Sequence, residues 1–269
     1  CNNRDFFGTN WQILDDKSQF IYGTLGIANH DVKSQAGHRF WFNHLRDNHS
    51  KLDGDLYEFG VYKGHTLISI ALLLKKLGSN KRVYGFDSFA GLNNYSEQDK
   101  FINFKKYENT IFQRSLVEQS LLAKHLKEII SKDKINSKNI SSSGQFDDAS
   151  YEDLIEKINS LGLDNITIIK GDFEETVPKF FSSGNKKIFS ANIDCDLYRG
   201  YKTCLPDVAE YLIPGGYVHL DEYYSTKFPG ARIACNEFFQ EAKDSMKALE
   251  LGKEDTPESE FERWFIKKV

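Results

Sequence analysis

The chain has 269 residues, enough to bury one sizeable hydrophobic core, and we expect a single elaborated domain over residues 1–269. Hydrophobic residues make up 40% of it and the formal net charge is −4, so it lacks the basic surface that nucleic-acid binding requires. No run of about 18 apolar residues offers a membrane span. The four cysteines form no CxxC pair, which is typical of reduced thiols in a cytoplasmic protein.

The first fifty residues predict an N-terminal helical cap (residues 1–50). A helix over about Ser34–His49 places Phe40, Trp41 and Leu45 on one face.

The pattern then changes to a strand, a glycine turn, a helix and a second strand. The strands cover Leu56–Phe59 and Arg82–Phe86, and the helix between them covers Thr66–Leu77 and ends at Gly78. Strand, helix and strand within about 30 residues predict a βαβ unit, in which the two strands pair in parallel.

Residues 93–147 interrupt this alternation. They are charged and rich in Ser, Asn and Lys, with one amphipathic helix predicted near Leu116–Ile130. A segment this long without regular structure is usually functional or disordered. We interpret it as an insertion or lid over one end of the sheet.

After the insertion, strands and helices alternate again, and Ser150 is the predicted N-cap of the first helix. The predicted helices cover residues 150–163, 174–183, 202–212 and 230–245, and the predicted strands cover 165–173, 187–194, 215–224 and 261–269. This alternation predicts an α/β doubly wound sheet. Ligands of such sheets bind at the carboxyl ends of the strands.

Acidic residues lie at four of these strand ends. They are Asp87, Asp172, the pair Asp194 and Asp196, and the pair Asp221 and Glu222. One such acid often caps the following helix. Four acidic strand ends are harder to explain by capping, because a buried carboxylate costs several kcal/mol unless it is paired or bound to a metal.

The glycine turn after the first strand contains Gly60 and Gly64, but it matches neither GxGxxG nor GxxxxGK[ST]. It is either a plain tight turn or a place where a ligand approaches the backbone closely. Asp87 follows at the distance at which an acid commonly accepts the hydroxyls of a ribose. A helix cap is the alternative for Asp87.

Six motifs then occur in order: "YEFGVYKGHT", "VYGFDSFAGL", "GQFDDASYEDL", "IIKGDFEETVP", "IDCDLY" and "PGGYVHLDEYY". Over roughly Asp55–Phe239 the chain resembles the macrocin O-methyltransferase (TylF-type) family of class I S-adenosylmethionine-dependent methyltransferases. The resemblance implies a Rossmann-like, mostly parallel seven-stranded sheet with an antiparallel C-terminal strand. It also implies transfer of a methyl group to a sugar hydroxyl with S-adenosylmethionine and a divalent cation, usually Mg²⁺.

The same resemblance implies roles for individual residues. The cofactor would contact Glu58, Gly60, Val61, Tyr62, Gly64, Thr66, Asp87, Ser88, Gly171, Asp172, Phe173 and Asp194, and the cation would bind Asp194, Asp221 and Glu222. The family pattern has two Asp residues at the last two positions, whereas this chain has Asp221 and Glu222. Carboxylate oxygens of either residue are ligands that Mg²⁺ accepts.

The proton acceptor is the least uniform group of the family. Metal coordination lowers the pKa of a hydroxyl, and a nearby base accepts its proton. Asp196 is the first candidate for this base, next to Asp194 in the catalytic set. Because some members use a histidine, His219 is a further candidate, with a core histidine as the alternative.

We therefore expect a sugar O-methyltransferase that acts on a glycoside, a nucleotide sugar or a surface polysaccharide, as in polysaccharide or natural-product biosynthesis. A homo-oligomer is plausible from the family. Two alternatives stay open: an O-methyltransferase of a phenolic or catechol compound, and a methyltransferase-like binding domain without catalysis. Aromatic residues near the acids would stack on a sugar or fill the core; these are Tyr198, Tyr201, Tyr223, Tyr224 and Phe228.

Overall fold

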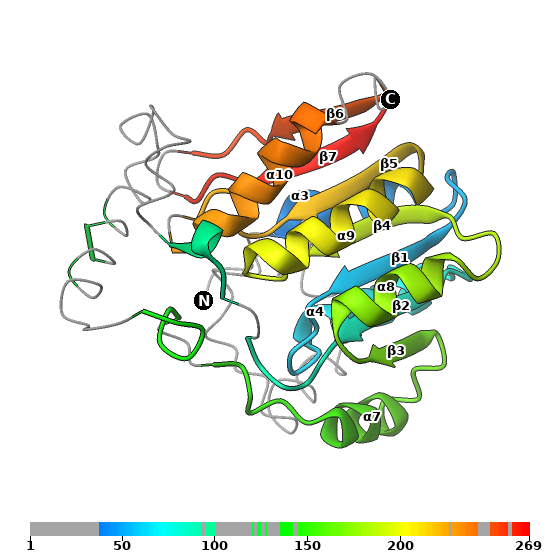
Figure 1. The fold of residues 1–269 in the computed structure, drawn as a ribbon. Helices are drawn as coiled ribbons and strands as arrows, with labels where there is room; N and C mark the ends of the chain where they lie inside the picture. The colour runs from blue at the N-terminus through cyan, green and yellow to red at the C-terminus, as the bar shows by residue number, and fades with distance from the viewer. Residues whose placement is uncertain are drawn as a thin grey trace.

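The computed structural model describes residues 38–92, 95–100, 120, 123–124, 127, 135–141, 145–225, 227–241, 248–257 and 260–269. Seven strands form one sheet in the order β3-β2-β1-β4-β5-β7-β6 (Figure 1). The strands are β1 (Asp55–Phe59), β2 (Val83–Asp87), β3 (Ile166–Lys170), β4 (Ile188–Ile193), β5 (Leu212–Leu220), β6 (Leu249–Lys253) and β7 (Trp264–Lys268). Strands β1 to β5 pair in parallel, and β7 is antiparallel to both β5 and β6. This confirms the predicted sheet with its antiparallel C-terminal strand.

The strand order reverses between β1 and β4. From β1 the chain proceeds outward through β2 to β3, whereas from β4 it proceeds in the opposite direction to β5. The loops that leave the carboxyl ends of β1 and β4 therefore diverge and leave a crevice between them, which is where open α/β sheets bind their ligands.

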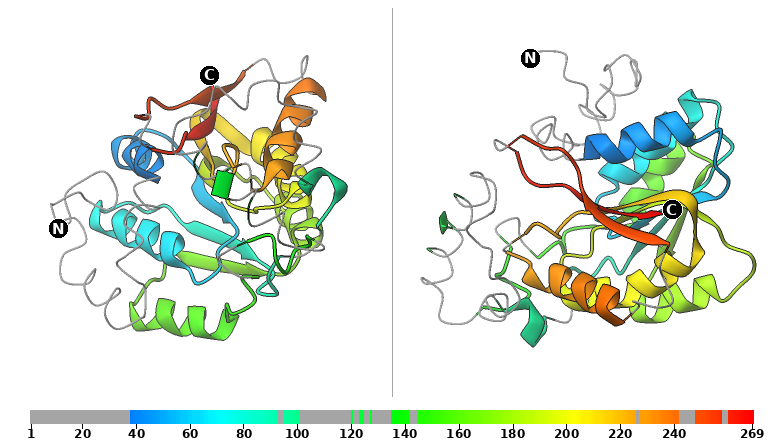
Figure 2. Two further views of the ribbon diagram at one scale, coloured as in Figure 1. Left: turned by 90° about the vertical axis from the view of Figure 1, so that its left-hand side faces the viewer. Right: turned by 90° about the horizontal axis from the view of Figure 1, so that it is seen from above.

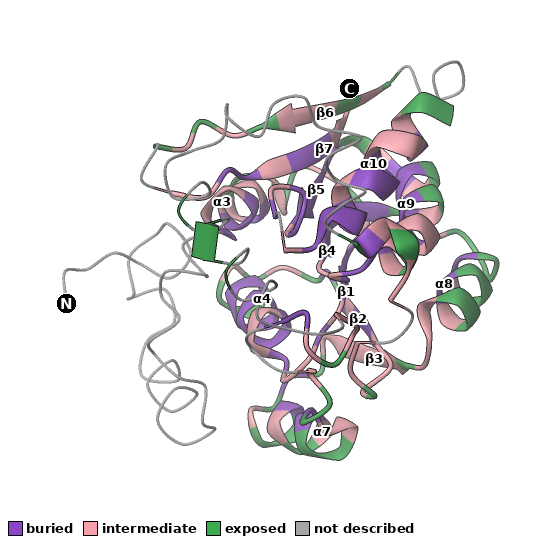
Figure 3. Ribbon diagram, turned by 60° about the vertical axis from the view of Figure 1, so that its left-hand side comes forward, coloured by how far each residue is buried: buried purple, intermediate pink, exposed green. Residues whose placement is uncertain are grey.

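Helices cover both faces of the sheet (Figure 2). They are α3 (Arg39–Asn48), α4 (His65–Lys76), α7 (Tyr151–Ser160), α8 (Phe173–Phe181), α9 (Tyr198–Tyr211) and α10 (Pro229–Glu241), with the short 3₁₀ helix η4 (Glu97–Asp99). One buried cluster joins α3, α4 and α7 to one face, and a second joins α8, α9 and α10 to the other. In Figure 3 the buried side of these helices faces the sheet.

The N-terminal helix α3 is attached to the sheet by a buried chain of hydrogen bonds. Trp41 Nε1 donates to Ser190 Oγ on β4 (2.7 Å), and Ser190 Oγ donates to the Tyr217 carbonyl on β5 (2.5 Å). Trp41 is fully buried. These bonds fix where α3 begins, which matters below because His38 immediately precedes it.

Helix α9 starts at Tyr198, four residues before the predicted start at Lys202. Its own N-cap, Leu197, has no capping side chain, and the Tyr198 N–H donates instead to Asp99 Oδ1 (2.8 Å). Asp99 is 1% exposed and also accepts from the backbone and hydroxyl of Ser96. A residue far away in the sequence thus supplies the cap, and it connects the beginning of the 93–147 segment to the sheet domain.

The other differences from the predicted elements are small. Strand β6 was not among the predicted strands, because hydrophobic and polar residues alternate only weakly in "LELGK". In the structure its Gly252 lies against the Phe265 ring. Strand β5 begins at Leu212 rather than Gly215 and ends at Leu220. Ser150 caps α7 as predicted, accepting from the Asp153 N–H (3.1 Å).

Some predictions fall on residues outside the described ranges. These include residues 34–37 of the predicted first helix and most of the predicted helix near Leu116–Ile130. Within the part of the chain that the structure describes, no helix has the length and apolarity to cross a membrane.

Candidate active site

The glycine turn between β1 and α4 brings two strands into direct contact. Gly60 has φ +94°, and a Cβ at this position would overlap the carbonyl oxygen of Asp194 at the end of β4. The Asp194 N–H donates to the Phe59 carbonyl (2.9 Å). Gly64, with φ +81°, is the N-cap of α4. Both glycines are therefore required by the backbone of this turn.

Asp87 at the end of β2 does not cap a helix. Its Oδ2 accepts the N–H groups of Val61 and Tyr62 (2.8 Å each), and its Oδ1 accepts the N–H of Phe89 (2.7 Å). The carboxylate thereby holds the β1–α4 turn against β2. The neighbouring Ser88 lines the same cavity as Asp87.

Asp172 does act as a helix cap. Its Oδ1 accepts the Glu174 N–H (2.9 Å) at the start of α8. Gly171, with φ +147°, donates its N–H to the Asp87 carbonyl (2.9 Å) and so carries the chain across the end of β2. Asp172 and Phe173 also line the cavity.

One cavity of about 430 Å³ collects most of the predicted residues, a volume in the range of small-molecule sites. Of the predicted cofactor and cation ligands, it is lined by Glu58, Gly60, Val61, Tyr62, Thr66, Asp87, Ser88, Asp172, Phe173, Asp194, Asp221 and Glu222, together with Asp196. Gly64 and Gly171 shape the backbone behind this wall. The strand-end acids therefore meet, as the α/β topology predicts.

Glu58 on β1 is 2% exposed at the base of the cavity. Its Oε1 accepts from Asn192 Nδ2 (3.2 Å), whereas its Oε2 is buried without a hydrogen-bond partner among the described residues. Burial raises the pKa of Glu58 to about 8, and the carboxylates of Asp87 and Asp221 act in the same direction. A buried acceptor without a partner marks a position where a ligand donor would be favourable.

Asp194, Asp221 and Glu222 form a compact carboxylate cluster. One oxygen of each lies within 4.8 Å of the others. Burial raises the pKa of Asp194 and of Glu222 well above the usual range, and repulsion from Asp221 and Asp196 raises both further. Among the described residues, no lysine or arginine forms an ion pair with Asp194 or Glu222. Crowded carboxylate oxygens are a donor set that suits a hard divalent ion.

Glu222 is oriented by Tyr201 from α9. The Tyr201 hydroxyl lies 2.8 Å from Glu222 Oε2 and accepts the Glu222 N–H (3.1 Å). Tyr201 is fully buried, so this aromatic ring belongs to the core and is not available for stacking on a ligand. Tyr224 and Phe228, in contrast, line the cavity.

Asp196 lies beyond the end of β4 with φ +57°, a left-handed conformation that is uncommon for residues other than glycine. Such backbone strain often accompanies functional positions. Burial raises the pKa of Asp196 to about 7, although the Lys227 ammonium opposes this shift. A carboxyl group whose pKa lies near neutrality is suited to accept a proton and release it again.

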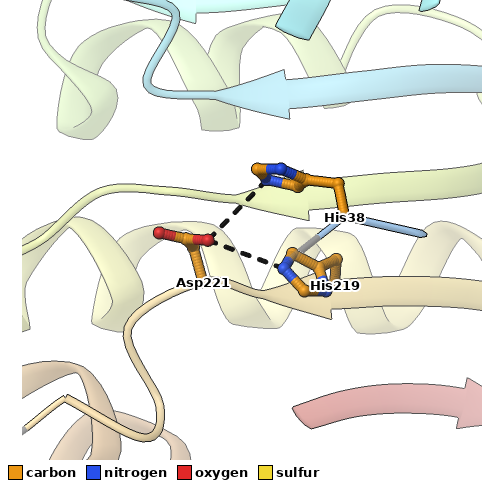
Figure 4. A group of neighbouring side chains, drawn as sticks. All are labelled: His38, His219 and Asp221. Atoms are coloured by element: carbon orange, nitrogen blue, oxygen red, sulfur yellow. Dashed lines mark ion pairs between the residues drawn. The ribbon is translucent and has the colours of Figure 1, made fainter. Parts of the chain in front are cut away.

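His219 and His38 both point at Asp221 (Figure 4). The Nε2 atoms of His219 and His38 lie 3.6 Å and 3.7 Å from the same oxygen, Asp221 Oδ1. Burial works to raise the pKa of Asp221, but the two imidazoles and Arg263 outweigh it, and the pKa is held below its usual range. His219 is fully buried and is not among the residues that line the cavity.

His38 and several cations of the cavity wall were not predicted from the sequence. His38 lines the cavity from the start of α3, and the cations are Lys63, Arg199, Lys227 and Arg263. Lys63 pairs with Asp148 (2.5 Å) and Arg199 with Glu174 (2.5 Å). In sequence these residues look like ordinary surface charges, and only the fold brings them to one cavity.

This sheet order, with a glycine turn after β1 and acids after β2, β4 and β5 around one cavity, is the class I Rossmann-like methyltransferase fold. The chain belongs to the family described as a methyltransferase domain, which matches residues 57–223. No curated protein sequence matches the chain.

Solved structures share this fold. The chain is similar to CalS11, a calicheamicin methyltransferase, with a TM-score of 0.64 and 18% identity over 96% of this chain and 88% of that one. It is also similar to the O-methyltransferase NovP, with a TM-score of 0.57 and 18% identity over 84% of this chain and 79% of that one. A third similar structure is an O-methyltransferase from Klebsiella pneumoniae, with a TM-score of 0.50 and 12% identity over 96% and 89%.

Proposed function

We propose that the chain is an S-adenosylmethionine-dependent O-methyltransferase of the macrocin type, which acts on a sugar hydroxyl and uses a divalent cation. The observation that carries this proposal is the cluster of Asp194, Asp221 and Glu222 in the same cavity as the β1–α4 turn and Asp87. The apo structure of CalS11, similar with a TM-score of 0.53, is described as a TDP-rhamnose 3'-O-methyltransferase.

S-adenosylmethionine, when bound, supplies a methyl group on a positively charged sulfur. The β1–α4 turn would hold its methionine part, where the free Oε2 of Glu58 can accept from an ammonium group. In this proposal Asp87 and Ser88 would bind the ribose hydroxyls, and Asp172 and Phe173 would bind the adenine; all four residues line the cavity. Asp87 keeps acceptor capacity for this role, because a carboxylate has about four lone-pair sites and three are used.

A divalent cation, when bound, lowers the pKa of a hydroxyl and orients it. Asp194, Asp221 and Glu222 would hold Mg²⁺ in this proposal, and the longer side chain of Glu222 is kept in place by Tyr201. Asp196 would hold the proton that the acceptor hydroxyl releases as its oxygen takes the methyl group. His219 lies behind Asp221, so we assign it no proton transfer.

The acceptor side of the cavity is polar and also carries aromatic rings. Lys227 Nζ donates to Ser141 Oγ (3.0 Å), and Arg263 lies 5.4 Å from the Tyr224 ring. Hydroxyl and cationic groups beside aromatic rings suit a sugar better than a flat phenol, which would need an apolar slot. A nucleotide sugar would add phosphates for these cations, so it is the first acceptor class to test.

The experiment is a calorimetric titration of S-adenosylhomocysteine and of Mg²⁺ into wild type, Glu222→Gln and Asp87→Asn. We expect wild type to bind both ligands, Glu222→Gln to lose only Mg²⁺, and Asp87→Asn to be weakened only for the cofactor. Absence of cofactor binding to wild type would contradict the enzyme proposal and support a binding domain without catalysis.

A panel of acceptors then tests the substrate class. Nucleotide sugars, simple glycosides, oligosaccharides and catechol are incubated with S-adenosylmethionine and Mg²⁺, and methylated products are detected by mass spectrometry. We expect methylation of at least one sugar and none of catechol. Methylation of catechol alone would contradict the sugar assignment and favour the phenolic alternative.

A further inference from the structure

We propose that His38, His219 and Asp221 form a second divalent-cation site, rich in nitrogen, which takes a transition metal such as Zn²⁺ or Co²⁺ in preference to Mg²⁺. Its three ligand atoms lie within 4.8 Å of one another. The site does not rest on the methyl-transfer proposal, because metal binding can be measured without cofactor or acceptor.

The distances in this group suit a shared ion better than direct hydrogen bonds. The two imidazole Nε2 atoms lie 3.6 Å and 3.7 Å from Asp221 Oδ1, longer than a hydrogen bond. Two ligand atoms on one tetrahedral zinc, each about 2.1 Å from the metal, are about 3.4 Å apart. Small side-chain shifts would therefore bring the three atoms onto one ion.

The imidazole nitrogens have nothing else to bind within the described part of the chain. Neither ring nitrogen of His38 or of His219 has a hydrogen-bond partner, and the two residues are 7% and 0% exposed. A buried polar group without a hydrogen-bond partner destabilises the folded state. An imidazole binds a metal ion through a ring nitrogen that carries no proton, and these buried nitrogens are held next to the Asp221 carboxylate.

Packing on apolar and aromatic groups orients the two rings. The His219 ring is parallel to the Trp41 ring, 6.3 Å away, and the His38 ring is 4.9 Å from that of His219. Trp41 is fixed by its hydrogen bond to Ser190 on β4 (2.7 Å). His219 on β5 and Asp221, the residue directly after the strand, lie two residues apart, and the His219 ring approaches the Asp221 carboxylate. The site is thus built from a strand and from the start of an anchored helix (Figure 4).

The donor types separate the two cation sites. Asp194, Asp221 and Glu222 offer only oxygen, which suits Mg²⁺, whereas two imidazoles and one carboxylate suit zinc, cobalt or iron. Both sets use Asp221. His38 and Asp221 line the cavity, so an ion can reach the nitrogen-rich site from there.

The test is the binding of Co²⁺ to the metal-free full chain, followed by visible absorption and calorimetry, with Zn²⁺ as competitor. The variants are Glu222→Gln, which disrupts only the oxygen-rich set, and His219→Leu and His38→Gln, which disrupt only the nitrogen-rich set. We expect Glu222→Gln to bind Co²⁺ like wild type and each histidine variant to bind at least about tenfold more weakly. Excess Mg²⁺ should leave the Co²⁺ spectrum of Glu222→Gln unchanged.

Circular dichroism and S-adenosylhomocysteine binding serve as folding controls for the histidine variants. His38 precedes α3 at the cavity wall, so His38→Gln carries the test if the fully buried His219→Leu loses its fold. Equal Co²⁺ affinity in wild type and His38→Gln would overturn the proposal. Loss of Co²⁺ binding in Glu222→Gln would overturn it as well, because the ion would then belong to the oxygen-rich set.

Discussion

The carboxylates on the two sides of the cavity differ in whether the protein itself supplies their hydrogen-bond partners. On the β1–β2 side, three backbone N–H groups satisfy Asp87, and the acid completes the fold of the turn. On the β4–β5 side, burial and repulsion from Asp221 and Asp196 raise the pKa of both Asp194 and Glu222. A satisfied acid stabilises the protein by itself, whereas crowded acids cost stability, which a bound cation would offset in the function proposed above.

The largest effect that separates the two sides is expected for Glu222→Gln. Methyl transfer should fall on the order of 10³-fold, because the cation loses a ligand. In EDTA, the free energy of unfolding should rise by about 1–2 kcal/mol, because the raised pKa of Glu222 makes folding take up a proton that Gln does not need. Initial rates and urea unfolding measure the two effects.

Glu250→Gln, on the exposed face of β6, is the matched control for this substitution and should change neither quantity. If Glu222→Gln is less stable than wild type in EDTA, the Glu222 carboxyl group stabilises the fold without a cation, which would contradict this prediction.

Asp196→Asn tests the proton acceptor on the same side. We expect kcat to fall about 10²-fold or more, since the amide cannot accept the proton. Binding of Mg²⁺ and of S-adenosylhomocysteine should stay within about threefold of wild type. Asn tolerates the left-handed backbone at this position (φ +57°), so the fold should be kept. An unchanged kcat at saturating acceptor would exclude Asp196 as the base.

Asp87→Asn tests the satisfied side and should have the opposite effect on stability. The amide NH₂ of Asn would face donors of the turn, so we expect a loss of about 2 kcal/mol in the free energy of unfolding. Affinity for S-adenosylhomocysteine should fall about tenfold or more. Asp153→Asn, at an exposed position of α7, is the matched control. Equal stability of Asp87→Asn and wild type would show that the hydrogen bonds of Asp87 do not stabilise the turn, and the two sides of the cavity would then not differ in this respect.

The smallest expected effect concerns His44, a half-buried titratable group outside the cavity. Burial lowers its pKa to about 4, and the Lys267 ammonium acts in the same direction. The folded state therefore binds the proton less well than the unfolded chain, so stability is full above pH ~6.5 and is lost as pH falls toward 4.

The variant His44→Phe keeps the ring contacts with Phe189 and Tyr217 (5.3 Å and 5.2 Å between centroids). Between pH 7 and pH 5 it should lose about 2 kcal/mol less stability than wild type. Urea unfolding at both pH values measures this difference. Parallel losses in the two proteins would show that His44 does not titrate with folding.

Local patterns predicted most of the fold. Strand and helix periodicity, the cap at Ser150 and the glycine turn lie within short stretches, and the acids at strand ends meet because parallel strands end at one edge. The start of α9 was misplaced because its cap, Asp99, is nearly a hundred residues away in sequence. For the same reason nothing in the sequence connects His38 with Asp221.

The role of each individual acid could not be predicted from the sequence either. Asp87 and Asp172 occupy equivalent strand ends, and capping was an alternative for both. Only the hydrogen bonds distinguish them: Asp172 caps α8, and Asp87 binds the neighbouring turn. Sequence shows which side chain is present, but the partner of a carboxylate depends on the direction of the backbone around it.

Gly60 joins the two sides at one point, since there is room for the Asp194 carbonyl oxygen and for no side chain. The turn that would hold the methyl donor and the strand that would hold the acceptor are therefore in backbone contact, and the distance between them is fixed. During evolution a new acceptor cannot be accommodated by spreading these strands apart. Diversification of acceptors in such a scaffold has to proceed through the segments that surround the cavity, while the reacting centre stays the same.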